Sequence, residues 1–157
     1  NAIPPEIGEL ENLNTLSIQD NDLVSLPSEI GKLTHLELLK LSYNKLNELP
    51  PEIGRLTNLK FLYIENNNIS KLPQEMGRLE RLQYFHLGKN QLEFLPAEIG
   101  QLTKLIELNV SKSGVLLKVP DSICNLRNLE YFYIDATTLI PYCLQVRIDS
   151  RFKIIIQ

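Results

Sequence analysis

The feature that most constrains this chain is a 23-residue period that runs through almost all of its 157 residues. Steps of 23 positions place asparagine on asparagine, proline on proline and glycine on glycine. The three columns are Asn21, Asn44, Asn67 and Asn90; Pro27, Pro50, Pro73 and Pro96; and Gly8, Gly31, Gly54, Gly77 and Gly100. Because one unit of this length cannot bury its own apolar face, such units stack on their neighbours. The sequence therefore predicts a tandem array.

The unit reads LxxLxxLxLxxNxLxxLPxxIGx, and successive copies begin at Leu10, Leu33, Leu56, Leu79, Leu102 and, one residue late, Leu126. This pattern resembles the leucine-rich repeat family, in the 23-residue LPxxIGxL type found in Ras-group scaffolds and many bacterial proteins. The resemblance implies an α/β solenoid, a right-handed horseshoe with a parallel concave sheet and short 3-10 or α turns on the convex side. We expect one domain over 1–157, with a truncated repeat at 1–9, repeats at 10–141 and a C-terminal capping segment at 142–157.

Alternation within each unit predicts which side chains face the core. In the copy that begins at Leu56, Leu62 and Ile64 point inward, whereas Phe61 and Tyr63 point outward. The resemblance implies that the asparagine after each strand is a ladder residue, whose amide bonds the backbone of the neighbouring turn. This role is structural, and the predicted ladder residues are Asn21, Asn44, Asn67 and Asn90.

The convex segment of each unit begins with a proline, which suits the first position of a short helix. An acidic residue follows in the first turn, where a negative charge meets the positive end of the helix dipole. These residues are Glu29, Glu52, Glu75 and Glu98. We interpret this column as a capping device and not as a cation site.

Two regions depart from the repeat. Between Ser111 and Pro120 the spacing slips by one residue, so that Ser113 takes a ladder position and the outgoing turn bulges. The slip is interpreted as adaptation to the nearby end of the array, with recognition as the alternative. Thr137 takes the ladder position of the next unit.

The last segment, 142–157, is expected to close the open end of the core, with Ile154 and Ile156 in a final strand. The N-terminal end opens inside a repeat and has no equivalent lid. We therefore expect a monomer whose truncated N-terminal end is the place where copies can associate. Earlier sequence, including any targeting signal, is expected to be missing.

The two cysteines, Cys124 and Cys143, lie 19 residues apart. Extracellular arrays of this family often end in clustered, disulfide-bonded caps, which this spacing does not match. The alternatives are two buried free thiols or one bridge, and the sequence favours free thiols. The compartment is unknown, with a lean towards the cytoplasm.

The outward strand positions are free to vary, and five of the six tyrosines fall on them. Tyrosine is enriched in protein-binding hot spots, although aromatic residues also suit strands for packing reasons. The predicted partner-binding residues are Lys40, Tyr43, Phe61, Tyr63, Glu65, Tyr84, His86, Glu107, Asn109, Tyr131, Tyr133 and Asp135. The patch centres on Phe61, Tyr63, Tyr84 and His86, with Tyr131 and Tyr133 as a second lobe.

The predicted function is therefore a protein- or peptide-binding module. The alternatives are a structural spacer that presents a missing domain, or a bacterial surface or secreted protein that contacts a host. A net charge of −3 and a sequence pI near 5.5 argue against nucleic-acid binding, and no apolar run is long enough for membrane insertion.

We expect no catalysis, metal or cofactor. His86 can approach Ser111 and Glu107 on the adjacent strand, but an open strand face lacks the buried orienting group and oxyanion donors that such chemistry needs. The histidines and cysteines are too dispersed for a structural zinc site.

Overall fold

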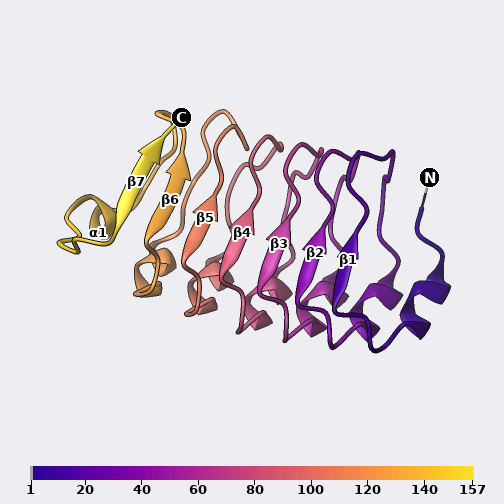
Figure 1. Ribbon diagram of the computed structural model, residues 1–157. Coiled ribbons are helices and arrows are strands. Elements are labelled where there is room, and N and C mark those ends of the chain that lie inside the picture. The colour runs from indigo at the N-terminus through magenta and orange to yellow at the C-terminus, as the bar shows by residue number, and fades with distance from the viewer. Residues whose placement is uncertain (1) are drawn as a thin grey trace.

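The computed structural model describes residues 2–157, and within them each unit contributes one short strand and one short helix to a solenoid. Figure 1 shows the strands side by side on one face and the 3-10 helices on the other. The strands form one parallel sheet in chain order: β1 (Thr15–Ser17), β2 (Leu38–Lys40), β3 (Phe61–Tyr63), β4 (Tyr84–His86), β5 (Glu107–Asn109), β6 (Tyr131–Ile134) and β7 (Lys153–Ile156). The predicted solenoid fold is confirmed.

The opposite side of the solenoid carries six 3-10 helices and, near the C-terminus, one turn of α-helix. They are η1 (Pro5–Glu9), η2 (Ser28–Lys32), η3 (Pro51–Arg55), η4 (Gln74–Arg78), η5 (Ala97–Gln101), η6 (Asp121–Asn125) and α1 (Tyr142–Gln145). The proline of each repeat lies one residue before its helix and not at the first helical position, as Pro50 does before η3. Its fixed φ sets the extended entry into the turn, and Glu52 lies in the first turn as predicted.

The 23-residue period becomes the register of the sheet. Phe61 pairs with Tyr84, and Tyr84 pairs with Glu107, so each outward column runs straight across the strands. Beneath them, Leu62 and Ile64 are fully buried, as predicted. The core is therefore a continuous layer of leucine and isoleucine between the sheet and the 3-10 helices.

Asparagine side chains tie each unit to its neighbours at the end of the strand. Asn67 Nδ2 donates to the carbonyl oxygens of Leu41 (3.1 Å) and Ile64 (3.0 Å), and its Oδ1 accepts from the backbone N–H of Leu46 (3.0 Å). Asn44 and Asn90 make equivalent bonds and are also buried. The ladder prediction is correct for these three residues.

Asn21 does not act as a ladder residue. It is exposed, and its side chain donates only within its own turn, to the carbonyl of Gln19 at 2.7 Å. The reason is positional, because β1 lies at the edge of the sheet and residues 2–14 add no strand beside it.

The slipped unit replaces the ladder amide with two separate bonds. Ser113 Oγ donates to the carbonyl of Leu87 at 2.7 Å, while the backbone N–H of Leu92 bonds the backbone carbonyl of Ser113. The next residue, Gly114, passes so close to the Leu92 carbonyl oxygen that a Cβ would overlap it. The bulge therefore needs glycine at this position.

Thr137 does not act as a ladder residue. Thr137 is exposed, whereas Thr138 is buried and its Oγ1 accepts from the backbone N–H of Asp135 at 3.1 Å. This bond stays within one turn, as the bond of Asn21 does, so neither threonine bonds the preceding unit through its side chain in the described structure.

The expectation of free thiols is wrong, because Cys124 and Cys143 form a disulfide. Cys124 lies in η6 and Cys143 in α1, with Cα atoms 6.1 Å apart, so the bridge joins the last regular turn to the terminal segment. The sequence spacing resembled no known cap, yet folding α1 against η6 brings the two side chains together. The lean towards the cytoplasm loses this support and stays an expectation.

The terminal segment adds a strand but does not close the sheet. Ile154 and Ile156 lie in β7, as predicted, and β7 pairs in parallel with β6. The Arg147 guanidinium donates to the carbonyls of Leu126 and Arg127 (3.0 and 2.9 Å), which holds the segment against the last repeat. However, β7 itself is the edge strand, and Ile156 is 64% exposed.

The ladder generates a stability prediction. Replacing Asn67 with alanine leaves the buried N–H of Leu46 without a partner and removes one of the two amide donors from the carbonyls of Leu41 and Ile64. The loss should lower the free energy of unfolding by about 1–3 kcal/mol. The matched control is Asn68→Ala, because Asn68 is exposed and should change stability by less than about 0.5 kcal/mol. Urea unfolding followed by circular dichroism measures both, and equal effects would contradict the ladder role.

The disulfide generates a second prediction. Reduction should lower the free energy of unfolding by about 2–4 kcal/mol, because the bridge limits the unfolded chain. Amide hydrogen exchange should then become faster in β7 than in β3. A Cys124→Ser/Cys143→Ser variant should behave like the reduced protein, and two reactive thiols in the unreduced, denatured protein would show that the bridge is absent.

Candidate functional site on the concave face

The outward side chains of β1 to β7 form what we call the concave face. Its centre is a cluster of four rings that the sheet register brings together from β3 and β4. The rings of Phe61 and Tyr84 stack with centroids 5.2 Å apart and planes 14° apart, and Tyr63 meets His86 edge to face at 4.9 Å. All four side chains are partly exposed. The residues that the sequence placed at the centre of the patch do lie together.

An imidazole lies between two carboxylates on this face. His86 Nε2 is 2.9 Å from Glu107 Oε1, and His86 Nδ1 is 3.7 Å from Glu65 Oε1. The three residues come from successive units and run diagonally across the sheet. His86 Nε2 is buried and, although it lies close to Glu107 Oε1, it makes no hydrogen bond among the described residues.

Two lysines lie over aromatic rings on either side of this centre. Lys40 Nζ is 5.8 Å from the centroid of Tyr63, and Lys153 Nζ is 5.7 Å from that of Tyr131. Both distances are in the range of cation–π attraction. Sequence reasoning missed Lys153, because the repeat pattern dissolves before β7 and nothing in the sequence sets its register.

The second lobe consists of Tyr131 and Tyr133 on β6, both partly exposed. Two other predicted residues are engaged by the protein itself. Asn109 Oδ1 accepts from the backbone N–H of Ser111 at 3.0 Å, and Asp135 Oδ2 accepts from that of Lys112 at 2.6 Å. They shape the turns after β5 and β6.

Tyr43 lies at the rim and not on the sheet. Its φ of 59° is left-handed, and its side chain is 53% exposed. The whole rim column shares this backbone conformation, with φ between 53° and 59°: Asp20, Tyr43, Asn66, Lys89 and Lys112. Alternation along an extended strand therefore cannot be used to predict where the side chains of these rim residues point, because their backbone is not extended.

The arrangement of a nucleophile, base and carboxylate is not formed. Ser111 Oγ lies 2.7 Å from Asn109 Oδ1 and 2.9 Å from Gln157 Oε1, so its neighbours are amides and not the His86 imidazole. Among residues 2–157, no group of three histidine, cysteine, aspartate or glutamate side chains is placed to hold a metal.

Burial and negative charge raise the pKa of two tyrosines on the concave face above its ordinary value near 10. For Tyr63 the causes are burial first, then Glu107, Tyr84 and Glu65. For Tyr133 they are burial, then Glu107 and Tyr131. Glu107 thus acts on both lobes of the patch.

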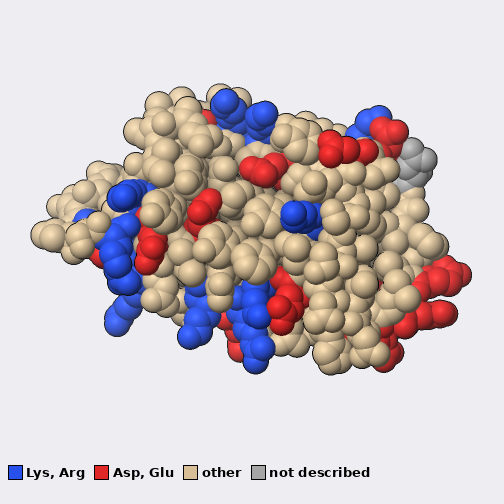
Figure 2. All heavy atoms as spheres, in the orientation of Figure 1, with Lys and Arg blue, Asp and Glu red and all other residues tan. Residues whose placement is uncertain are grey.

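Charges of both signs are interleaved on the surface that carries the strands, as Figure 2 shows, and no continuous basic stripe is present in this view. The described helices are all too short to span a bilayer.

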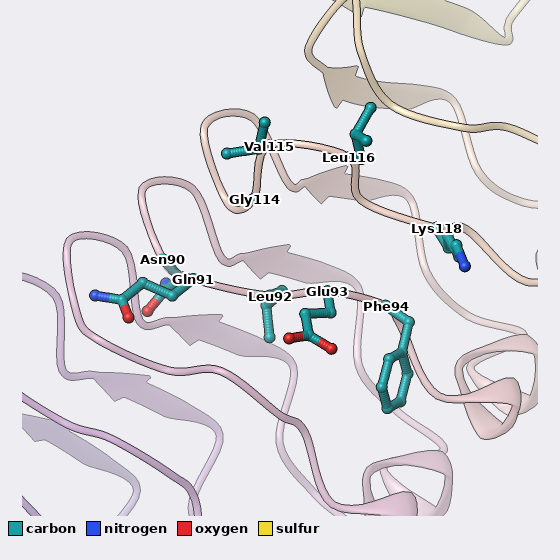
Figure 3. A pocket seen from close by; sticks show the side chains of 9 residues that line it. All are labelled: Asn90, Gln91, Leu92, Glu93, Phe94, Gly114, Val115, Leu116 and Lys118. Carbon is teal, nitrogen blue, oxygen red and sulfur yellow. The ribbon is translucent and has the colours of Figure 1, made fainter.

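A hollow of about 460 Å³ lies away from the strands, beside the Gly114 bulge. Figure 3 shows its walls, which come from 90–94 of one unit and 114–118 of the next. Phe94, Val115 and Leu116 expose apolar surface there. The sequence identified the slip but not the hollow, which needs both turns in place.

Known proteins are similar to this chain in sequence pattern and in fold. A family model described as a leucine-rich repeat region matches residues 28–92. The leucine-rich repeat protein LIC12759 of Leptospira interrogans is 32% identical over 92% of this chain and 43% of that protein, with a TM-score of 0.67. No curated protein is similar enough in sequence to count as a match.

Two plant receptors of known structure are also similar. The plant peptide hormone receptor RGFR1, in complex with RGF2, is 33% identical over 99% of this chain and 26% of that chain, with a TM-score of 0.86. The ectodomain of the membrane receptor kinase GASSHO1/SCHENGEN3 of Arabidopsis thaliana, in complex with CASPARIAN STRIP INTEGRITY FACTOR 2, is 33% identical over 99% and 19%, with a TM-score of 0.82. This chain spans less than half the length of each of these three proteins.

The tyrosines provide a test of the site's electrostatics. Removing the charge in Glu107→Gln should lower the pKa of both Tyr63 and Tyr133, because a nearby carboxylate disfavours the phenolate. Glu65→Gln is the matched variant and should lower the pKa of Tyr63 but not that of Tyr133. Carbon-13 NMR of labelled tyrosine rings resolves the two titrations. An unchanged pKa of Tyr133 in the Glu107→Gln variant would contradict the proximity of Glu107 to this tyrosine.

The raised pKa values of these two tyrosines also determine how the stability of the fold changes with pH. The folded pKa of each tyrosine lies above its unfolded value near 10. The stability linked to these groups is therefore fully present below about pH 10 and is lost as the pH rises through the raised pKa.

Proposed function

We propose, from the premise that this chain is a leucine-rich repeat protein, that it is a non-enzymatic module that binds a protein or peptide through its concave face. The observation that carries the proposal is the four-ring cluster of Phe61, Tyr63, Tyr84 and His86. Its rings are partly exposed above a core that Leu62 and Phe85 already fill. Packing of the core therefore does not require them.

Physical properties of the cluster suit recognition. Aromatic rings bring a large contact area at a small cost in side-chain entropy, and tyrosine adds a polar tip that can bond a partner. The contacts between Phe61 and Tyr84 and between Tyr63 and His86 hold the rings in place before a partner arrives. Such preorganisation lowers the entropy that binding would otherwise lose.

The similar proteins give further support. Two of them are receptors whose structures contain a bound factor, RGF2 in one and CASPARIAN STRIP INTEGRITY FACTOR 2 in the other. A parallel sheet that presents a long row of variable positions is the surface that solenoid proteins use for extended partners. The identity of the partner is a separate question, because this chain spans less than half of those receptors.

The test is a cross-linked capture from the source cell or its host. The native chain should retain a partner that Tyr63→Ala/Tyr84→Ala loses by about tenfold or more, since each ring contributes hot-spot contact. Tyr142→Ala is the matched control, because Tyr142 is 74% exposed but lies in α1, outside the concave face. Its capture should equal that of the native chain.

Circular dichroism must show the same fold for all variants. A partner retained equally by the native chain and by Tyr63→Ala/Tyr84→Ala would refute recognition by the concave face. If Tyr142→Ala lost as much of the captured partner as Tyr63→Ala/Tyr84→Ala, the binding site would lie instead at the terminal segment.

A further inference from the structure

The two carboxylates beside His86 have no lysine or arginine partner in the described part of the chain. Two carboxylates elsewhere on the surface pair with a lysine of the neighbouring unit: Asp22 with Lys45 at 2.6 Å and Glu37 with Lys60 at 2.9 Å. Glu65 and Glu107 instead share one imidazole. Among the described residues, these two carboxylates therefore lack the lysine partner that Asp22 and Glu37 have.

The shared imidazole cannot neutralise both carboxylates. An imidazole carries at most one positive charge. With both carboxylates ionised, Glu65, His86 and Glu107 together therefore carry a net charge of −1 or −2. Their side chains are only 29%, 19% and 20% exposed, so water screens this charge less than it screens an open surface pair. The raised pKa values of Tyr63 and Tyr133, in which Glu107 takes part, are consistent with this excess negative charge.

The rings around the carboxylates already attract cations from the protein itself. Lys40 lies over Tyr63 and Lys153 over Tyr131, one on each side of the acidic centre, yet neither forms an ion pair with Glu65 or Glu107 among the described residues. An arginine side chain uses both features at once. Its planar guanidinium stacks on an aromatic ring while its N–H groups bind a carboxylate in two places.

We propose, resting on the concave-face binding proposed above, that the partner is a protein or peptide segment that presents an arginine side chain to Glu65 and Glu107 among the tyrosine rings. Charge complementarity carries this assignment: a partly buried, uncompensated negative centre favours a cationic group and rejects a carboxylate or phosphate. The arginine orients the segment, and the rings of the two lobes contact the residues on either side of it.

The test uses a phage-displayed library of random twelve-residue peptides, selected on the native chain and counter-selected on Tyr63→Ala/Tyr84→Ala. The enriched peptides should share an arginine. Replacing that arginine with citrulline, which keeps the shape and removes the charge, should weaken binding by at least about tenfold in fluorescence anisotropy.

Variants of the protein, tested against the arginine and citrulline peptides, form the second half of the experiment. Glu107→Gln and Glu65→Gln should each weaken the arginine peptide by several-fold and leave the citrulline peptide nearly unchanged, which a merely structural role would not produce. Asp20→Asn is the matched control: Asp20 is an exposed acidic rim residue whose left-handed backbone also suits asparagine. It should leave both affinities unchanged.

The outcomes separate the two proposals. Tyrosine-dependent peptides that lack a basic residue, or that tolerate citrulline, would overturn the arginine assignment and leave concave-face binding in place. Peptides that bind the native chain and Tyr63→Ala/Tyr84→Ala equally, or no enrichment at all, would overturn both.

Discussion

The hydrogen bonds of the buried asparagine after β2, β3 and β4 are the interaction on which the regular stack depends. A 23-residue unit leaves its strand through a turn whose backbone groups face the core, where no water can bond them. The Asn67 amide makes two bonds to the preceding unit. Its Nδ2 donates to the carbonyl of Leu41, and its Oδ1 accepts from the N–H of Leu46. One side chain thus satisfies the turn and fixes the offset between units, which burial of leucine alone does not specify.

This offset determines what the concave face can display. From β1 to β5 the register places side chains 23 residues apart beside each other, and between β5 and β6 the offset is 24. The same register brings side chains at diagonal positions close together. Phe61 stacks on Tyr84 for this reason, and the diagonal joins Glu65, His86 and Glu107. The core supplies a rigid support, while the outward positions are free to carry rings and charges that folding does not require.

The regularity ends where other constraints replace the asparagine. Ser113 divides the ladder bonds between its hydroxyl and its carbonyl, and Gly114 lets the bulge pass the neighbouring carbonyl. Beyond it, the Cys124–Cys143 disulfide and the Arg147 guanidinium hold α1 and the following loop against the last repeat, and β7 continues the sheet. The terminal segment is therefore held by a covalent bond and side-chain contacts in place of the repeat pattern.

The sequence by itself determined the period, the parallel sheet, the buried leucine layer and the columns of the concave face, because each follows from spacing that repeats every 23 residues. It placed Phe61, Tyr63, Tyr84 and His86 in one cluster for the same reason. It could not place what spacing does not control. The pairing of Cys124 with Cys143, the position of Lys153 over Tyr131 and the burial of Thr138 in place of Thr137 all depend on how the irregular end folds. The contact of His86 with both Glu65 and Glu107 also needed the tertiary structure, since the rotamers of side chains from three successive units decide which of them meet.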